Sequence, residues 1–320
     1  MKVAVHNKYE FITHDGFLFK NPQSDIGHNL LKPWNQLYEE GKKRGVEFYT
    51  VDQIPPEQVD VLICMDRPDR DLPHFNMPYM KKIFIIYEPE FLVPGNWDKA
   101  FHDKFDLVLT WRDDLLDGKK YHKSNFTVDW SERIDPFITR ERYNERKMLI
   151  LMNTAKTHSN PHCLYGSRIT AINWFDAHAP RDFDLYGRGW QQCGYKTYRG
   201  TTDNKLRTLN DYNFNLAYEN CNNQPGYITE KLLDSFLSGT VPVYYSAGVP
   251  ERHIPQDTYI NPLHFETYDD LYKFLKYMKY NEYDSYLQAM DNFIRSDKAE
   301  QFSNEWFIER MFKFLEGMAC

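Results

Sequence analysis

The stretch FNLAYENCNNQPGYITEKLLDSFLSGTVPVYYSA, residues 214–247, decides the fold. Its first seven residues, 214–220, form an apolar run that ends in polar residues, which is typical of a buried strand. Apolar residues then recur at helical spacing from Tyr227 to Ser238, and Gly239 ends this pattern as a C-terminal cap does. A second apolar run follows from Val241 to Tyr245. The stretch therefore predicts a strand, a helix and a strand of a parallel sheet.

Short apolar runs alternate with helix-like segments on both sides of this stretch. The other expected strands, rich in Val, Ile, Leu and Phe, cover residues 3–5, 47–51, 59–65, 82–87, 105–110, 148–152 and 183–186. A polar, weakly periodic region, residues 121–147, interrupts the alternation. We therefore predict two α/β domains, residues 1–145 and residues 146–320, the second with a helical tail from Tyr268. Ligands of such sheets bind at the carboxyl ends of the strands, in a cleft between the two domains.

The composition is that of an ordinary globular protein and excludes several functions. The 320 residues are 42% hydrophobic and carry a net charge of −7, and no dense cluster of Lys and Arg predicts binding to nucleic acid. No apolar run approaches the roughly 20 residues that cross a bilayer, and no signal peptide opens the chain. The five cysteines are widely spaced and form no CxxC motif, which favours a reducing compartment. We therefore expect a cytoplasmic protein without a transmembrane segment.

The first turn of the expected helix carries Glu230 and Lys231. A helix N-terminus presents free N–H groups and a partial positive charge, so it attracts phosphate. A lysine at this position is unfavourable by roughly 0.3–1 kcal/mol unless an anion lies nearby. Lys231 therefore indicates a diphosphate, and Glu230 is suited to accept hydrogen bonds from ribose hydroxyls. The alternative is an ordinary Glu–Lys pair on a helix surface.

The deciding stretch closely resembles the donor-binding signature of the α-1,3/1,4-fucosyltransferase family, glycosyltransferase family 10. The matching strings are Tyr-Glu-Asn at 218–220, Tyr-Ile-Thr-Glu-Lys-Leu at 227–232 and Ser-Gly-Thr-Val-Pro-Val-Tyr-Tyr at 238–245. The resemblance is looser over residues 82–111 and 148–189. Membership implies two Rossmann-like domains that face each other across a cleft, the GT-B type. It also implies a GDP-fucose donor, no metal or other cofactor, and inversion at the anomeric carbon.

The resemblance also implies a donor site. The residues that match donor-site positions of the family are Asn220, Tyr227, Glu230 and Lys231, with Glu230 on the ribose and Lys231 on the diphosphate. A family arginine matches Arg168, which lies near the start of the first helix expected in the second domain. Two cations on neighbouring helices can hold a diphosphate and stabilise it as a leaving group. The alternative for Arg168 is a surface salt bridge.

An inverting transfer is a single displacement and needs one carboxylate to take the proton of the acceptor hydroxyl. Glu88 follows the apolar run 82–87, so it is expected at the carboxyl end of a strand beside the cleft. The proposed base of the family matches Glu88. Glu90 is the rival, because it lies only two residues further on. A third interpretation is that both are surface carboxylates of a loop.

The expected function is transfer of L-fucose from GDP-β-L-fucose to an oligosaccharide acceptor, α-1,3 to the GlcNAc or Glc of a lactosamine-type chain. Another nucleotide-sugar donor, or a glycan- or nucleotide-binding module without catalysis, would fit the same scaffold. The loop Asp66–Asp71 contains an Asp-x-Asp pair that would hold Mn²⁺ or Mg²⁺ in a metal-dependent transferase, although a charged loop explains it as well. A ligand contact from Gly27-His28-Asn29, peripheral contact with a membrane and the oligomeric state stay open.

Overall fold

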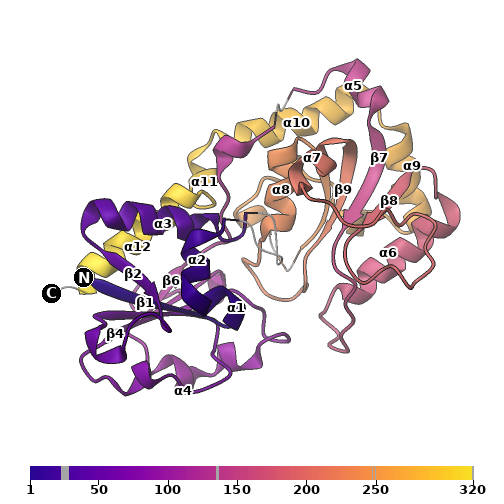
Figure 1. The fold of residues 1–320 in the computed structure, drawn as a ribbon. Coiled ribbons are helices and arrows are strands. Elements are labelled where there is room, and N and C mark those ends of the chain that lie inside the picture. The colour runs from indigo at the N-terminus through magenta and orange to yellow at the C-terminus, as the bar shows by residue number, and fades with distance from the viewer. Residues whose placement is uncertain (23–28, 135–136, 247, 249, 319–320) are drawn as a thin grey trace. The chain divides into compact units, whose positions relative to one another are not determined.

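The chain folds into two compact α/β units (Figure 1). The computed structural model describes residues 1–22, 29–134, 137–246, 248 and 250–318. The first unit comprises Met1–Asp129 and Gln301–Cys320, and the second comprises Trp130–Glu300. Each unit is built on one parallel sheet, and short 3₁₀ helices lie in several of the connections.

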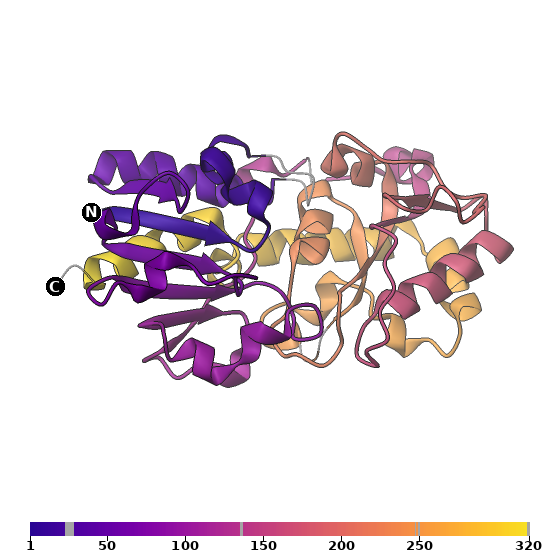
Figure 2. The ribbon, with the colours of Figure 1, turned by 60° about the horizontal axis from the view of Figure 1, so that its bottom comes forward.

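The first unit contains a six-stranded parallel sheet with the strand order β2-β1-β3-β4-β5-β6. The strands are β1 (Lys2–Asn7), β2 (Glu47–Thr50), β3 (Val61–Met65), β4 (Lys81–Ile86), β5 (Leu107–Thr110) and β6 (Tyr121–Lys123). Figure 2 shows these strands pointing in the same direction. The chain places β2 on one side of β1 and β3 on the other, so the topological switch point lies between β1 and β3.

Helices cover both faces of this sheet (Figures 1 and 2). They are α1 (Glu10–Thr13), α2 (Phe17–Lys20), α3 (Lys32–Arg44), α4 (Lys99–His102) and α12 (Asn304–Met318). Successive side chains of a strand point to opposite faces. Accordingly, Val3 and Val5 belong to the apolar cluster that includes Trp34 of α3, whereas Ala4 belongs to the cluster that includes Phe101 of α4.

The C-terminal helix α12 belongs to the first unit, whereas the sequence led us to expect all of residues 146–320 in the second domain. Phe307 and Met311 of α12 pack in the same apolar cluster as Trp34, and the ring centroids of Trp34 and Phe307 lie 5.2 Å apart. The division after Asp129 also comes earlier than the expected boundary after residue 145. An amphipathic pattern shows that one helix face is buried, but it does not identify the element that buries it.

The second unit contains a four-stranded parallel sheet with the strand order β10-β9-β7-β8. The strands are β7 (Lys147–Met152), β8 (Phe183–Tyr186), β9 (Tyr212–Tyr218) and β10 (Val241–Tyr245). The helices are α5 (Arg140–Glu145), α6 (Tyr165–His178), α7 (Lys205–Asn210), α8 (Glu230–Ser238), α9 (Tyr268–Tyr277), α10 (Tyr280–Ile294) and α11 (Asp297–Glu300). β8 and β9 flank β7 on opposite sides, so the switch point lies between β7 and β9.

The deciding stretch forms the predicted unit, with β9, α8 and β10 in succession. Gly239 ends α8 in the left-handed conformation, with φ at 63°, as a C-terminal cap requires. α8 begins at Glu230 rather than at the expected Tyr227, because Thr229 caps the helix and its side chain accepts a hydrogen bond from the backbone N–H of Lys231. Residue 247 lies outside the described residues.

The structure bears on three further expectations. The polar, weakly periodic region 121–147, which interrupts the alternation of strands and helices, contains β6 and α5; β6 is an edge strand whose residues are half-buried, which explains its weak pattern. None of the described helices is both long and apolar enough to cross a membrane. The described cysteines, Cys64, Cys163, Cys193 and Cys221, are free thiols, and Cys320 lies outside the described residues. Gly27 and His28 also lie outside them.

Candidate active site

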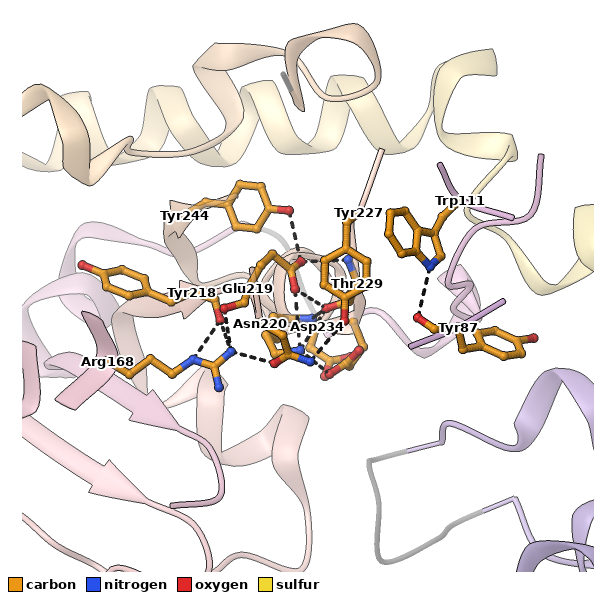
Figure 3. Close-up of polar contacts among 12 residues, drawn as sticks. Tyr87, Trp111, Arg168, Tyr218, Glu219, Asn220, Tyr227, Thr229, Asp234 and Tyr244 are labelled. Carbon is orange, nitrogen blue, oxygen red and sulfur yellow. Dashed lines mark hydrogen bonds and ion pairs between the residues drawn. The ribbon is translucent and has the colours of Figure 1, made fainter. Parts of the chain in front are cut away.

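The loop between β9 and α8 is organised around the fully buried side chain of Glu219 (Figure 3). Its Oε1 accepts hydrogen bonds from the backbone N–H of Thr229 at 2.8 Å and from the hydroxyl of Tyr244 at 3.1 Å. Its Oε2 accepts a hydrogen bond from the hydroxyl of Thr229 at 2.8 Å. Burial raises the pKa of Glu219, and the nearby charge of Lys231 opposes that effect. Glu219 thereby fixes the cap of α8 and the position of its first turn.

Lys231 lies in that first turn between two carboxylates. Its Nζ is 3.1 Å from Oε1 of Glu230 and 3.6 Å from Oε2 of Glu219. Burial lowers the pKa of Lys231, but the charges of Glu230 and Glu219 outweigh burial and raise it, so Lys231 is a cation. Burial likewise raises the pKa of Glu230, but the charges of Lys231 and Lys205 outweigh burial and lower it to about 2. The pair is charged and mostly buried, unlike an ordinary surface pair.

Arg168, in the second turn of α6, is only 5% exposed. Its Nη2 donates hydrogen bonds to the carbonyl oxygens of Tyr218 and Glu219, at 2.6 and 2.8 Å. Its Nε donates a hydrogen bond to the carbonyl of Tyr218 at 3.2 Å. Within the described residues Arg168 forms no ion pair, so it is not the surface salt bridge of the alternative interpretation. Burial lowers its pKa, yet an arginine stays protonated in proteins. An anionic ligand would stabilise such a buried cation.

Asn220 and Tyr227 extend this network. Oδ1 of Asn220 accepts a hydrogen bond from Nη2 of Arg168 at 2.9 Å, and its Nδ2 donates one to the hydroxyl of Tyr227 at 3.1 Å. The side chain of Tyr227 is almost completely buried. The five residues expected at the donor site therefore converge on one edge of the second sheet, but only Arg168 and Lys231 line the pocket that opens there.

That pocket lies at the carboxyl ends of β7 and β9, at the switch point of the sheet. Three cations line it, namely Arg168, Lys205 and Lys231, together with the amides of Asn153 and Asn215. Oδ1 of each amide is buried and has no hydrogen-bond partner in the described part of the chain. Buried polar atoms of this kind are normally satisfied. Lys205 and Lys231 already have carboxylate partners, whereas buried Arg168 has none among the described residues and therefore favours an anion. The pocket therefore fits an anionic ligand that carries hydrogen-bond donors.

Lys205 and Glu219 had no role in our prediction from the sequence. Lys205 opens α7, and its Nζ lies 2.6 Å from Oδ2 of the buried Asp234. It follows a long polar connection, residues 187–204, in which no pattern distinguishes one lysine from another. Glu219 did give a signal, since it is a carboxylate directly after an apolar strand, but nothing in the spacing identifies its hydrogen-bond partners.

In the first unit, Glu88 follows β4 at the carboxyl edge of the six-stranded sheet. Its Oε1 accepts a hydrogen bond from the hydroxyl of Tyr9 at 2.8 Å. Its Oε2 accepts none from the described residues. Glu90 is exposed, and its side chain has no hydrogen bond or ion pair with any part of the chain that is described. The hydrogen bond from Tyr9 therefore orients the carboxylate of Glu88 and leaves Oε2 available to a ligand, whereas no contact with the described residues orients the carboxylate of Glu90.

Asp66, which follows β3, holds the backbone of this segment. Its Oδ1 accepts hydrogen bonds from the backbone N–H groups of Tyr87 and Glu88, at 2.8 and 3.1 Å, and from Nδ2 of Asn96 at 2.6 Å. The carbonyl of Tyr87 accepts a further hydrogen bond from Nε1 of Trp111 at 3.0 Å (Figure 3). Burial and the charge of Glu88 raise the pKa of Asp66 to about 7. Asp66 thus fixes the backbone position of Glu88 without contacting its side chain.

The rest of the loop Asp66–Asp71 contacts the segment after β1. Asp69 forms an ion pair with Lys8, and Nε of Arg70 lies 3.0 Å from Oε1 of Glu10. The loop between β3 and β4 therefore contacts the residues on both sides of Tyr9. Over the described residues, His, Cys, Asp and Glu side chains nowhere gather in threes as metal ligands would.

Comparison with known proteins identifies the family. The profile of glycosyltransferase family 10 (fucosyltransferase), C-terminal region, matches residues 145–312, which is more than half of the chain. The chain therefore belongs to glycosyltransferase family 10. Two curated relatives are similar over shorter stretches. An α-(1,3)-fucosyltransferase of Helicobacter pylori is 32% identical over 73 residues, or 23% of this chain and 15% of the relative. A 4-galactosyl-N-acetylglucosaminide 3-α-L-fucosyltransferase 9 of Mus musculus is 37% identical over 75 residues, or 23% and 21%.

Solved structures resemble the chain over much more of its length. A crystal structure of an α1,3-fucosyltransferase with GDP-fucose has a TM-score of 0.58 and 18% identity, and the match covers 98% of this chain and 89% of that one. A DNA-modifying β-glucosyltransferase has a TM-score of 0.57 and 11% identity, with full coverage of both chains. At such low identity the likeness shows the fold, which confirms the predicted GT-B class.

Proposed function

We propose that this chain is an inverting fucosyltransferase, which moves L-fucose from GDP-β-L-fucose to an oligosaccharide, α-1,3 to the GlcNAc or Glc of a lactosamine-type chain. The observation that carries the proposal is the pocket at the switch point of the second sheet, where Arg168, Lys205 and Lys231 converge within the segment matched by the family profile. The curated relatives are named as fucosyltransferases, and one similar solved structure contains GDP-fucose. These names support the choice of donor and acceptor.

In this proposal the second unit binds the donor. Arg168 and Lys231 contact the diphosphate, and Lys205, held by Asp234 at 2.6 Å, adds a third positive charge. Glu230 accepts hydrogen bonds from the ribose hydroxyls. Fixed cations stabilise the negative charge that develops on the diphosphate as it leaves, and they need no rearrangement at that moment. We propose on this basis that no metal or other cofactor takes part, so transfer persists in EDTA; loss of transfer in EDTA would contradict this point.

The first unit supplies the base. The carboxylate of Glu88 takes the proton of the acceptor hydroxyl as the hydroxyl oxygen forms a bond to C1 of fucose. The bond from C1 to the diphosphate oxygen breaks in the same step, and its electron pair leaves with GDP. One displacement converts the β-linked donor into an α-linked product. Oε2 of Glu88 suits this role, because it has no hydrogen-bond partner among the described residues.

The test combines binding with transfer. A thermal-shift panel of GDP, UDP, ADP and CMP, each also as a nucleotide sugar, should show the largest stabilisation with GDP and GDP-fucose. Incubation with GDP-fucose and N-acetyllactosamine should then release GDP and form a fucosylated product. Preference for UDP would favour another nucleotide-sugar donor on the same scaffold. Tight GDP binding without transfer to any member of a glycan array would favour a binding module.

A further inference from the structure

Two large aromatic side chains lie exposed directly after β1. Tyr9 is 38% exposed and Phe11 is 49% exposed, and their ring centroids lie 6.5 Å apart. Single apolar side chains on a surface are normal and need no explanation. These two differ because they are adjacent and because the hydroxyl of Tyr9 donates a hydrogen bond to Glu88.

The local fold explains why Phe11 points to solvent. It lies on α1, a helix of four residues whose Ile12 and Thr13 are buried. On the other side of this short helix, the ring of Phe11 makes an edge contact with Phe17 of α2, at a centroid distance of 6.1 Å. Phe17 itself packs on the core of the first unit. Phe17 therefore links the exposed ring of Phe11 to the apolar core of the first unit.

The two rings belong to the edge of the sheet where ligands bind. Tyr9 follows β1 and Glu88 follows β4, so both lie beyond the carboxyl ends of parallel strands in the sheet that has its switch point between β1 and β3. The ion pairs of Lys8 and Glu10 hold the chain on each side of Tyr9. Because Tyr9 occupies Oε1 of Glu88, Oε2 is the oxygen that a ligand hydroxyl can reach.

We infer that Tyr9 and Phe11 form an acceptor subsite, which binds one pyranose ring of the oligosaccharide beside Glu88. One face of a pyranose ring is made of C–H groups and packs against aromatic rings, while its equatorial hydroxyls point outward to polar groups. Binding sites of this type combine an apolar surface with a few oriented polar groups. The inference rests on the proposed role of Glu88 as the base, and it names the part of the first unit that recognises the acceptor.

The experiment measures acceptor binding separately from transfer. N-acetyllactosamine and lactose are titrated by NMR into the full chain saturated with GDP, and the affinity of GDP is measured for each variant. Phe11→Ala and Tyr9→Ala should weaken glycan binding about three- to tenfold, the size of one aromatic contact. Tyr9→Phe and Phe11→Trp keep a ring and should restore most of that loss. Tyr79→Ala is the matched control, since Tyr79 belongs to the same unit and is 96% exposed.

The outcomes separate this inference from the proposed function. Glycan affinities of Phe11→Ala and Tyr9→Ala equal to that of Tyr79→Ala would overturn the subsite, as would a wild-type chain that binds no oligosaccharide on a glycan array. Ring-dependent glycan binding by a wild-type chain that transfers no fucose would leave the subsite in place and contradict only the proposed transfer.

Discussion

Replacement of Lys231 by methionine removes one cation from the pocket and keeps an unbranched side chain of similar length. A hydrogen bond to a charged group contributes about 1.5–3 kcal/mol, and about 1.4 kcal/mol corresponds to a factor of ten. GDP affinity should therefore fall about 10- to 150-fold. The structure favours the upper half of this range, because Glu230 and Glu219 lose a partner at 3.1 and 3.6 Å and their charges would then repel the diphosphate.

Calorimetry with GDP and with guanosine distinguishes loss of a phosphate contact from damage to the fold. Guanosine has no phosphate, so its affinity should stay within about twofold of the wild type. Lys147→Met is the matched control. Nζ of Lys147 lies 2.7 Å from Asp184 at the opposite end of β7 from the pocket, and Asp184 keeps Arg199 as a partner at 2.5 Å. Unchanged GDP affinity in Lys231→Met, or an equal loss for guanosine, would refute the assignment of Lys231 to the diphosphate.

Three further predictions concern the two units separately. Glu88→Gln should keep GDP affinity but lose transfer at least about a hundredfold, whereas Glu90→Gln should transfer normally; transfer by Glu88→Gln at the wild-type rate would eliminate it as the base. Arg168→Lys should weaken GDP binding, while Arg146→Lys, a change at another buried arginine with neutral partners, should lower stability alone. Equal GDP affinities of these two variants would argue against a contact between Arg168 and the diphosphate. Asp66 has a pKa raised to about 7, so the folded chain retains a proton that the unfolded chain loses near pH 4, and stability should fall as the pH rises from about 4 to 7. The melting temperature of Asp66→Asn, which keeps the accepting oxygen, should lack this fall. Identical pH profiles of melting temperature for the wild type and Asp66→Asn would contradict the prediction.

The sequence was most informative where the elements that pack on one another are consecutive in the chain. β9, α8 and β10 follow one another within residues 212–245, so their apolar periods and Gly239 predicted strand, helix and strand correctly. The resemblance to glycosyltransferase family 10 lies in this same segment, and it led to residues that the fold does gather at one sheet edge. Local sequence is sufficient there because consecutive elements of a βαβ unit pack on each other.

Features that depend on distant parts of the chain were not predictable. Tyr9 and Glu88 are far apart in sequence, and their hydrogen bond follows from the order of β1, β3 and β4 in the sheet. Lys205 reaches the pocket only because α7 and α8 are neighbours, which its polar surroundings do not indicate. The C-terminal helix α12 has an apolar face, but only the folded chain shows that this face packs against Trp34 of the first unit.

The most direct test of the central claim is the anomeric configuration of the product that the wild-type chain makes from GDP-β-L-fucose and N-acetyllactosamine, read from the H1 coupling in its proton NMR spectrum. A single displacement with Glu88 as the base predicts an α-linked fucose and one GDP released for each glycosidic bond formed. A β-linked fucose, or GDP released without a new glycosidic bond, would contradict the account.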